Sequence, residues 1–263
     1  MDKLSSKNRT ALGIFYGVFS SIIFGFSFLF TKLGTTYGTE FSLLMWRFVF
    51  AAIGFIVLLS FKLIKLDLKG KGVWQLVLLG LLDPCFYFIC ETFGIAMTTN
   101  AESSIILACA PITSFLFARL FLNEKTSIYQ KLGVVLTISG VIMTVWSVIT
   151  ELSFSPVGYA FLLCAMTSYS LFGLGISKLS RFSSTEITVV QIFVAGIFFI
   201  IAGVISGIMD GNLPEIIRLP FEEPLFLASA LFQGIMCSIV GFICCNEAIK
   251  MIGMAATSTF LGV

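Results

Sequence analysis

Residues 79–125 read LGLLDPCFYFICETFGIAMTTNAESSIILACAPITSFLFARLFLNEK, and this stretch decides the fold. Two long apolar runs flank a short polar hairpin, Thr98–Glu102. The first run carries Asp83 and Glu91, and the second ends in the polar turn Asn123–Lys125. Burying a carboxylate in hydrocarbon is costly, so such a group normally faces the interior of a helix bundle or a wet cavity. The stretch therefore predicts two membrane-crossing helices whose polar groups face away from lipid.

The polar residues of the first run follow a helical spacing. Asp83, Tyr87 and Glu91 are each four residues apart, which places them on one slowly turning stripe of a helix. Pro84 has no amide hydrogen to donate to the carbonyl of Gly80, and this leaves a polar, kink-prone position beside Asp83. We expect this stripe to line a transport path.

The composition places the whole chain in a membrane. Hydrophobic residues make up 58% of the 263 residues, charged residues only 11%, and the mean hydropathy is +1.04. A helix needs roughly 20 apolar residues to cross a bilayer. Runs of this kind cover residues 10–31, 41–61, 73–97, 103–122, 132–150, 152–177, 187–209 and 225–246. The expected fold class is therefore an all-α polytopic membrane protein with eight complete spans.

The distribution of basic residues predicts the orientation. If the N-terminus lies in the cytoplasm and successive spans alternate, most of the basic residues fall on the inner side, and only Lys32 and Arg218 fall on the outer side. The inner set is Lys3, Lys7, Arg9, Lys62, Lys65, Lys69, Lys71, Arg119, Lys125, Lys131, Lys178, Arg181 and Lys250. Cytoplasmic loops carry an excess of Lys and Arg. We expect a multi-pass protein of the cytoplasmic (inner) membrane with its N-terminus inside.

Several kinds of chemistry are excluded by what the sequence lacks. The chain has no His, which removes Ser-His-Asp and Cys-His catalysis and His-based metal sites. It has no G-x-x-x-x-G-K-[ST] motif for binding nucleotide phosphates. Its seven Cys all fall within apolar spans, without a metal-type pair, and are expected to be hydrophobic filler. We expect no metal, no cofactor and no enzymatic activity.

Two pairs of segments suggest an internal repeat. Thr31–Leu33 closes the first span as Ser177–Leu179 closes the sixth, and Gly94–Met97 resembles Ala248–Met251. Each repeat would hold five spans, an odd number, so the second must lie inverted relative to the first. Inverted repeats are typical of secondary transporters, with a site near the middle of the membrane. The alternative is chance similarity among apolar helices.

The repeat predicts the division of the chain. The first five-helix repeat is expected at residues 1–151 and the second, inverted repeat at residues 152–263. By this comparison Ala255–Val263 begins a ninth span, and nine helical residues reach only about 13 Å, which is too short to cross. We expect the second repeat to be incomplete here and the natural chain to continue beyond Val263.

Three places in the chain resemble the drug/metabolite transporter superfamily, specifically its EamA-type ten-helix permeases and exporters. The similar segments are Gly25–Leu33, Met45–Phe48, and the series Ala110-Pro111, Leu122–Lys125, Gln130–Gly133 and Gly140-Val141. Asn123 stands where the family usually has Gly, a mild departure because Asn also accepts left-handed turns. The resemblance implies an alternating-access carrier of two five-helix repeats, and it leaves the substrate open.

Two groups of polar residues in the spans are candidates for the working site. The expected substrate contacts are Asp83, Tyr87, Glu91, Tyr169 and Gln191. The expected gating or coupling residues are Lys32, Arg47, Glu91, Glu102 and Glu247. A carboxylate within a span is a candidate for exchanging protons with a substrate. The alternative is a static network that orients the helices, with Arg47 extending its long stem toward the membrane surface.

We expect a secondary transporter of a small metabolite, such as an amino acid or a related polar or amphiphilic compound, with proton coupling left open. The alternatives are a polytopic membrane enzyme and a non-transporting sensor or assembly subunit. The expected partners are a small-molecule substrate and the lipid bilayer, with no nucleic acid, and a homodimer is left open.

Overall fold

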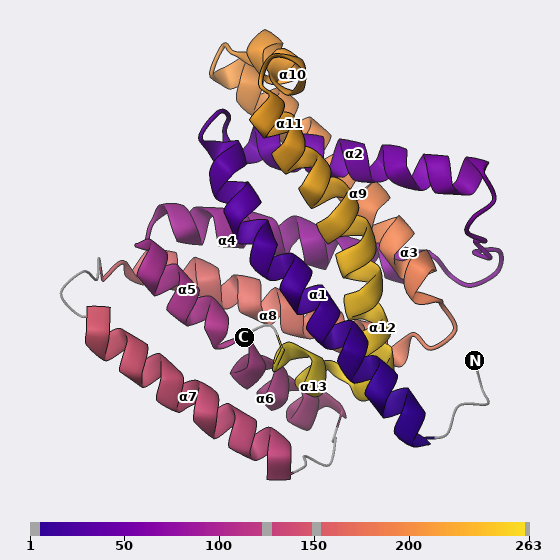
Figure 1. Cartoon of the computed structure of the whole chain (residues 1–263), viewed down its shortest axis with the longest axis vertical. Coiled ribbons are helices and arrows are strands. Elements are labelled where there is room, and N and C mark those ends of the chain that lie inside the picture. Colours follow the sequence, from indigo (N-terminus) through magenta and orange to yellow (C-terminus); the bar gives the residue numbers. More distant parts are fainter. Residues whose placement is uncertain (1–5, 123–127, 149–153, 261–263) are drawn as a thin grey trace. The chain divides into compact units, whose positions relative to one another are not determined.

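The computed structural model describes residues 6–122, 128–148 and 154–260, and its regular elements in these ranges are helices (Figure 1). Two elements are labelled η: η3 is a π-helix, in which hydrogen bonds join residues five apart, whereas η1 spans a kink between two helices at Asp83. The helices are α1 (Ser6–Thr35), α2 (Glu40–Ser60), α3 (Trp74–Gly80), η1 (Leu81–Phe86), α4 (Tyr87–Ala96), α5 (Asn100–Ala108), α6 (Ala110–Leu122), α7 (Ile128–Val148), α8 (Pro156–Lys178), α9 (Ser184–Met209), α10 (Leu213–Glu222), α11 (Pro224–Leu231), η3 (Phe232–Gly241), α12 (Phe242–Ile252) and α13 (Met254–Ser258).

These helices account for the predicted membrane spans. Within the described residues, seven helical stretches are long and apolar enough to cross a membrane: Asn8–Thr35, Glu40–Ser60, Trp74–Ala96, Ala101–Phe121, Pro156–Lys178, Ser184–Met209 and Pro224–Ile252. A shorter apolar stretch, Val135–Trp146, lies within α7 at the predicted fifth span. The all-α polytopic fold class is confirmed.

The chain folds into two compact units. We call residues 1–18, 82–180 and 247–263 the first unit, and residues 19–81 and 181–246 the second unit. The chain passes between the units within α1, within the third span at Leu81–Leu82, before α9, and within α12 at Asn246–Glu247. Each unit therefore combines segments from both predicted halves of the sequence, and its core can be described by itself.

In the first unit, α8 packs against α4, α5, α6 and α13. A Cβ atom at Gly94 of α4 would lie 2.6 Å from Cγ of Leu162 and 3.2 Å from its backbone nitrogen. Glycine at this position thus allows the backbones of α4 and α8 to approach closely. Ala118, Leu174 and Ala255 form a small buried cluster where α6, α8 and α13 meet.

In the second unit, α2 packs against α9, α11 and η3. The rings of Phe48 on α2 and Phe199 on α9 stack with their centroids 5.4 Å apart. Leu43, Phe226 and Ala230 form a buried cluster between α2 and α11. Stacked aromatic rings and buried apolar side chains thus pack α2 against α9 and α11.

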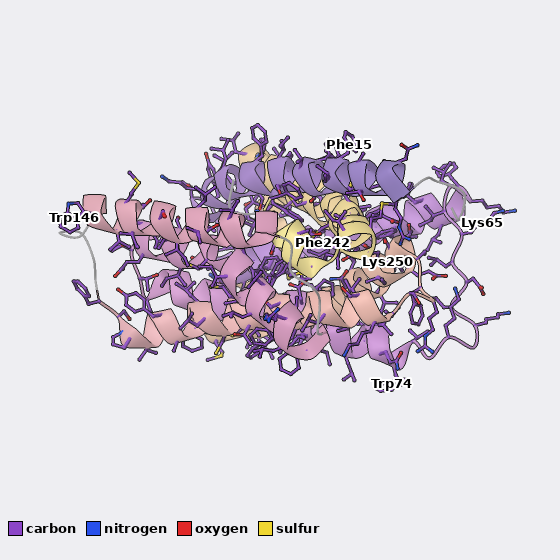
Figure 2. All side chains as sticks on the ribbon, turned by 90° about the horizontal axis from the view of Figure 1, so that it is seen from below. Phe15, Lys65, Trp74, Trp146, Phe242 and Lys250 are labelled. Atoms are coloured by element: carbon purple, nitrogen blue, oxygen red, sulfur yellow. The ribbon has the colours of Figure 1, made fainter. Side chains whose placement is uncertain are left out.

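The apolar side chains on the outside of the helices are suited to contact with lipid. Figure 2 shows Trp146, near the end of α7, and Phe15, on α1, pointing outward. Trp146 is 80% exposed and Phe15 is 60% exposed. Helices that remain apolar on their exposed faces are typical of membrane spans.

The third span is interrupted at Asp83, and here the predicted stripe is wrong. Asp83 has φ −138° and ψ 117°, an extended conformation inside η1, and Pro84 follows it. The four-residue spacing between Asp83 and Tyr87 therefore does not place them one turn apart on a continuous helix. The spacing argument holds from Tyr87 to Glu91, which both lie in α4. The predicted kink beside Asp83 is present.

The fourth span is also two helices rather than one. α5 ends at Ala108 and α6 begins at Ala110, so Cys109 lies between them and Pro111 occupies the first turn of α6. Proline is tolerated in the first turn, where its missing N–H would have no intrahelical partner. The sequence pattern treated Pro111 as an internal residue of one span.

The kink at η1 and the π-helix η3 bear on the predicted repeat. Gly94 and Ala248 are 154 positions apart in the comparison that suggested the repeat. The same shift carries η1 (Leu81–Phe86) to residues 235–240, which lie inside η3. The irregular segments of the third and eighth spans thus occupy related positions, and the repeat remains a prediction.

The connection from Asp210 to Pro224 contains the helix α10. Ile216 of this helix is buried, and its carbonyl accepts a hydrogen bond from Trp46 Nε1 at 2.9 Å. The predicted turn at Asn123–Lys125 and the boundary between the predicted halves at residues 151–152 lie outside the described residues.

Candidate functional site

Three of the predicted substrate contacts meet in the first unit. The Tyr87 hydroxyl on α4 donates a hydrogen bond of 2.8 Å to Glu91 Oε1 on the same helix. The ring of Tyr169 on α8 lies with its centroid 6.3 Å from that of Tyr87. All three side chains are half-buried. We call this group of Tyr87, Glu91 and Tyr169 the tyrosine–glutamate cluster.

The kink in the third span is fastened to the same helix that carries Tyr169. Ser168 Oγ on α8 donates a hydrogen bond of 2.6 Å to the carbonyl of Leu82. Asp83, the next residue, is buried, with 8% of its surface exposed. A hydroxyl from α8 thus satisfies a backbone carbonyl in the irregular segment, as backbone polar groups within a membrane require. Asp83 remains a candidate through this location rather than through a shared helix face.

A group of hydroxyls joins α6 to α8 after the break in the fourth span. Ser170 Oγ donates to Thr113 Oγ1 at 3.1 Å, and the hydroxyl oxygens of Ser114 and Ser170 lie 3.2 Å apart. Ser114 and Ser170 are fully buried. Sequence reasoning did not place Thr113 and Ser114 among the site residues. Their position just after Pro111 was an available signal, because polar groups often accompany proline in membrane helices.

The second unit holds Gln191 in a buried amide cluster. Asn246 Nδ2 donates hydrogen bonds of 2.9 Å to Gln191 Oε1 and 3.0 Å to Thr188 Oγ1. All three side chains are at most 2% exposed. Thr188 and Asn246 were not predicted site residues. The signal for Asn246 was a side-chain amide in the apolar eighth span, where polar side chains usually bond across helices.

Arg47 is buried, and the expectation that it extends to the membrane surface is wrong. Its Nε donates to Ser238 Oγ and its Nη1 donates to Gln233 Oε1, both at 2.8 Å. Gln233 Nε2 in turn donates to Thr31 Oγ1 at 2.7 Å. Only 4% of Arg47 is exposed. The guanidinium bonds inward because η3 offers it two oxygen acceptors, which avoids an unsatisfied charge in hydrocarbon.

Glu102 caps the first helix of the fourth span. Its Oε2 accepts from the backbone N–H of Thr99 at 2.7 Å, and the Thr99 hydroxyl accepts from the Glu102 N–H, which completes a capping box. Its Oε1 accepts from the N–H of Phe154 at 3.0 Å and from the hydroxyl of Tyr159. This buried carboxylate therefore joins the start of α5 to the start of α8, and its predicted gating role remains a prediction.

A second capping glutamate, Glu186, was missed entirely. Its Oε2 accepts from the N–H of Ser183 at 2.8 Å in a capping box at the start of α9. Its Oε1 accepts from the N–H of Asp67 at 2.9 Å and from Lys71 Nζ at 3.0 Å. The pattern Ser183-x-x-Glu186 before an apolar run was readable from the sequence as a capping box.

Lys71 lies outside the membrane spans, in the loop before α3, and Glu186 changes its titration. The hydrogen bond and the negative charge of Glu186 favour the protonated ammonium and hold the pKa of Lys71 above its usual value, although partial burial opposes the shift. Lys71 also lies 3.6 Å from Asp67 Oδ2. The three residues Asp67, Lys71 and Glu186 therefore fasten the loop between α2 and α3 to the start of α9 in the second unit.

The remaining predicted gating residues fall in different units. Lys32 is exposed near the end of α1, in the second unit with Arg47. Glu247 is half-buried on α12, in the first unit with Glu91 and Glu102. The grouping of these residues into a gate remains a prediction. In the part of the chain that the structure describes, no group of three or more His, Cys, Asp or Glu residues could hold a metal ion.

Comparison with known proteins finds relatives that are named as uncharacterized transporters. Over 244 residues the chain is 29% identical to "Uncharacterized transporter YcxC" of Bacillus subtilis (strain 168), covering 91% of this chain and 77% of that protein. It is 23% identical over 249 residues to "Uncharacterized transporter YyaM" of the same organism, covering 92% and 79%. It is 26% identical over 147 residues to "Uncharacterized transporter in sor 3'region" of Acidianus ambivalens, covering 56% and 55%.

The family match extends over nearly the whole chain and falls into two stretches. The EamA-like transporter family matches residues 11–146 and residues 156–263. These stretches include the tyrosine–glutamate cluster and the buried amide cluster, and together with the apolar spans they describe a multi-pass membrane protein. The chain belongs to the EamA-like transporter family.

Proposed function

We propose that this chain is a secondary transporter that moves a small metabolite across the cytoplasmic membrane by alternating access. The substrate class proposed is an amino acid or a related polar or amphiphilic compound. Support comes from membership of a transporter family, from the apolar spans and from the lack of a nucleotide-binding motif. The distribution of basic residues supports an N-terminus in the cytoplasm.

The observation that carries this proposal is the tyrosine–glutamate cluster. A carboxylate and two phenol rings lie together in apolar spans. The Tyr87 hydroxyl lies 2.8 Å from Glu91 Oε1, and the ring centroids of Tyr87 and Tyr169 are 6.3 Å apart. A substrate ammonium can pair with Glu91 and lie against the rings, since aromatic faces attract cations within about 6 Å. The same rings can pack against an apolar part of the substrate. Glu91 can also release or take up a proton, which is the basis of the proposed proton coupling.

The buried amide cluster is the proposed contribution of the second unit. The amide of Gln191 and the amide of Asn246 together offer both donors and acceptors, which suits a carboxylate or hydroxyl of a substrate. Asp83 is retained as a candidate contact because it is buried at the kink of the third span.

The proposed gating or coupling residues are charged. They are Lys32, Arg47, Glu91, Glu102 and Glu247. The buried capping role of Glu102 and the hydrogen bonds of Arg47 give each a local structural function as well. The proposed division into inverted repeats at residues 1–151 and 152–263 is supported by the two stretches of the family match and by the related positions of η1 and η3.

Uptake into proteoliposomes tests the proposal. The purified chain is reconstituted and offered labelled amino acids and other metabolites, with and without a pH gradient across the membrane. We expect saturable uptake of at least one solute that depends on the gradient, and we expect Glu91→Gln to abolish that dependence. Glu215→Gln, a change at an exposed position of α10, is the matched control and should behave like the wild type.

The possible outcomes separate the parts of the proposal. Saturable uptake that does not depend on the gradient, in both the wild type and Glu91→Gln, would retain the carrier and remove the proton role of Glu91. Uptake that is no greater than in empty liposomes for the whole panel would contradict the proposed substrate class. An equal loss of uptake in Glu215→Gln would show that the assay reports protein quality rather than the site.

A further inference from the structure

The hydrogen bonds of Arg47 fall on two residues that are five positions apart. Nε bonds Ser238 and Nη1 bonds Gln233, both at 2.8 Å, and both residues lie in the π-helix η3. The Ser238 hydroxyl also donates to the carbonyl of Gln233 at 3.0 Å. One side chain of α2 therefore holds the two ends of a single π-helical turn.

This spacing distinguishes the π-helix from the α-helix. Hydrogen bonds in a π-helix join residues five apart, so Gln233 and Ser238 lie nearly above one another in η3. In an α-helix, with 3.6 residues per turn, the same two residues point about 140° apart. A guanidinium whose two donors lie in one rigid plane can bond both oxygens only when the two residues share a face. The pair of bonds is thus specific for the π register.

The close packing of α2 and η3 supports the same arrangement. A Cβ atom at Gly234 would lie 2.7 Å from the carbonyl oxygen of Arg47, so the two backbones nearly touch beside the bonded residues. The guanidinium lies 5.8 Å from the ring centroid of Phe242, the first residue after η3. Arg47 therefore contacts the π-helix from its second residue to the residue that follows it.

The register of η3 determines which side chain faces Gln191. A π-helical turn accommodates one extra residue, so returning η3 to the α form would move the following residues by one position and rotate them by about 100°. Asn246 now bonds Thr188 and Gln191. After such a shift Cys245 would take its place, and a thiol is a much poorer hydrogen-bonding partner than an amide.

We propose that Arg47 is a positioning residue that holds the eighth span in its π register and so presents Asn246 to Gln191. Arg47 acts through η3 and needs no contact with the substrate. Its connection to transport rests on the proposed function, in which the buried amide cluster contacts the substrate. The structural part of the proposal, the choice of register, stands apart from transport and is measurable alone.

A disulfide formed by a cysteine at position 188 reports the register of the eighth span. A cysteine at position 246 faces position 188 in the π register, and native Cys245 would face it in the α register. A disulfide requires Cβ atoms about 4 Å apart, so the thiol of Thr188→Cys can join only the side chain that faces it. The π reporter carries Thr188→Cys, Asn246→Cys and Cys245→Ala. The α reporter carries Thr188→Cys and retains Cys245. Cys244→Ala is included in both, and the joined fraction is measured after oxidation of the purified protein in detergent.

With Arg47 present, we expect the π reporter to oxidise and the α reporter to remain reduced. In the Arg47→Gln background we expect the ratio of the two joined fractions to fall by at least about tenfold, which is typical for loss of buried hydrogen bonds to a charged group. Arg47→Lys keeps the charge but loses the planar pair of donors, so it should resemble Arg47→Gln. Ser238→Ala removes one of the two anchors and should shift the ratio in the same direction by less, in a variant more certain to fold.

An unchanged ratio in Arg47→Gln and Ser238→Ala would overturn the register proposal. A ratio restored by Arg47→Lys would also overturn it, because charge alone would then suffice. Transport kinetics give the link to function: we expect the KM of the transported solute to rise more than the maximal rate falls in Ser238→Ala. If the variants shift the ratio but the wild type transports nothing, Arg47 still holds the π register, and the proposed function is contradicted instead.

Discussion

The hydroxyl of Tyr87 is the most direct test at the scale of single residues, because it donates a hydrogen bond to Glu91 within the tyrosine–glutamate cluster. Tyr87→Phe keeps the ring that faces Tyr169 and removes the hydroxyl that bonds Glu91. A hydrogen bond to a charged group contributes about 1.5–3 kcal/mol, so we expect the apparent affinity for substrate to fall roughly tenfold or more. Concentration-dependent uptake measures it. Phe88→Tyr on the same helix is a control that leaves the bond to Glu91 in place, and a KM unchanged in Tyr87→Phe would argue against the cluster.

Glu186 is the residue at which the stability of the folded protein is most directly tested. Glu186→Gln keeps the size of the side chain but removes the charge that bonds Lys71 and one acceptor for the backbone N–H groups of Ser183 and Asp67. Leaving buried donors unpaired costs about 1–3 kcal/mol, so we expect a clear fall in the midpoint of thermal unfolding in detergent. Asp67→Asn changes a side chain that is 79% exposed and should have little effect.

The pH dependence of stability follows from Lys71. Its pKa is higher in the folded protein than in the unfolded chain because Glu186 favours the ammonium. The stabilisation is therefore fully present below the ordinary lysine pKa of about 10.4 and is lost as the pH rises through the higher folded value. We expect the unfolding midpoint to fall more steeply above this pH in the wild type than in Lys71→Met. Parallel curves for the two proteins would mean that the ion pair does not contribute.

At the scale of helices, the close approach of α2 and η3 depends on Gly234. Gly234→Ala would place its Cβ 2.7 Å from the carbonyl oxygen of Arg47, and a backbone atom cannot move aside as a flexible side chain can. Overpacking of this kind costs about 1–3 kcal/mol. Gly25→Ala is the matched control on α1, since nothing lies within 4 Å of its added Cβ. Thermal unfolding of the two variants should therefore differ, and equal midpoints would contradict the packing argument.

The helices also show where sequence reasoning succeeds. Tyr87 and Glu91 were predicted to be neighbours because a four-residue spacing is local and depends only on an unbroken helix. The same argument failed at Asp83, since the extended backbone there is set by its surroundings as well as by Pro84. The capping boxes at Glu102 and Glu186 were local patterns that the sequence contained and that the functional interpretation overlooked. Local signals were sufficient for these elements wherever the helix was regular.

At the scale of the whole chain, apolar runs predicted the membrane spans, but they did not predict which distant segments contact one another. The partners of Arg47 lie 186 and 191 residues away, and nothing in a single sequence specifies such a contact. The prediction that Arg47 extends toward the membrane surface was reasonable for an isolated helix, but it is wrong because η3 supplies hydrogen-bond acceptors inside the protein. In the amide cluster, Gln191 was predicted as a site residue and Asn246 was not, because the two residues are 55 positions apart in the sequence.

Orientation in the membrane is the prediction that belongs to the whole molecule. The excess of basic residues predicts that the loop with Lys65 lies inside and that α10 lies outside. We expect a membrane-impermeant thiol reagent added to intact cells to label Arg218→Cys, whereas Lys65→Cys should react only after the cells are permeabilised. The parent chain is the control, because six of its seven native thiols are at least partly buried and Cys164, the exposed one, lies within a span. The reverse labelling pattern would place the N-terminus outside. That result would leave the helices and both clusters unchanged, but it would reverse the side to which Glu186 and Lys71 are assigned and with it the direction of any proton-driven transport.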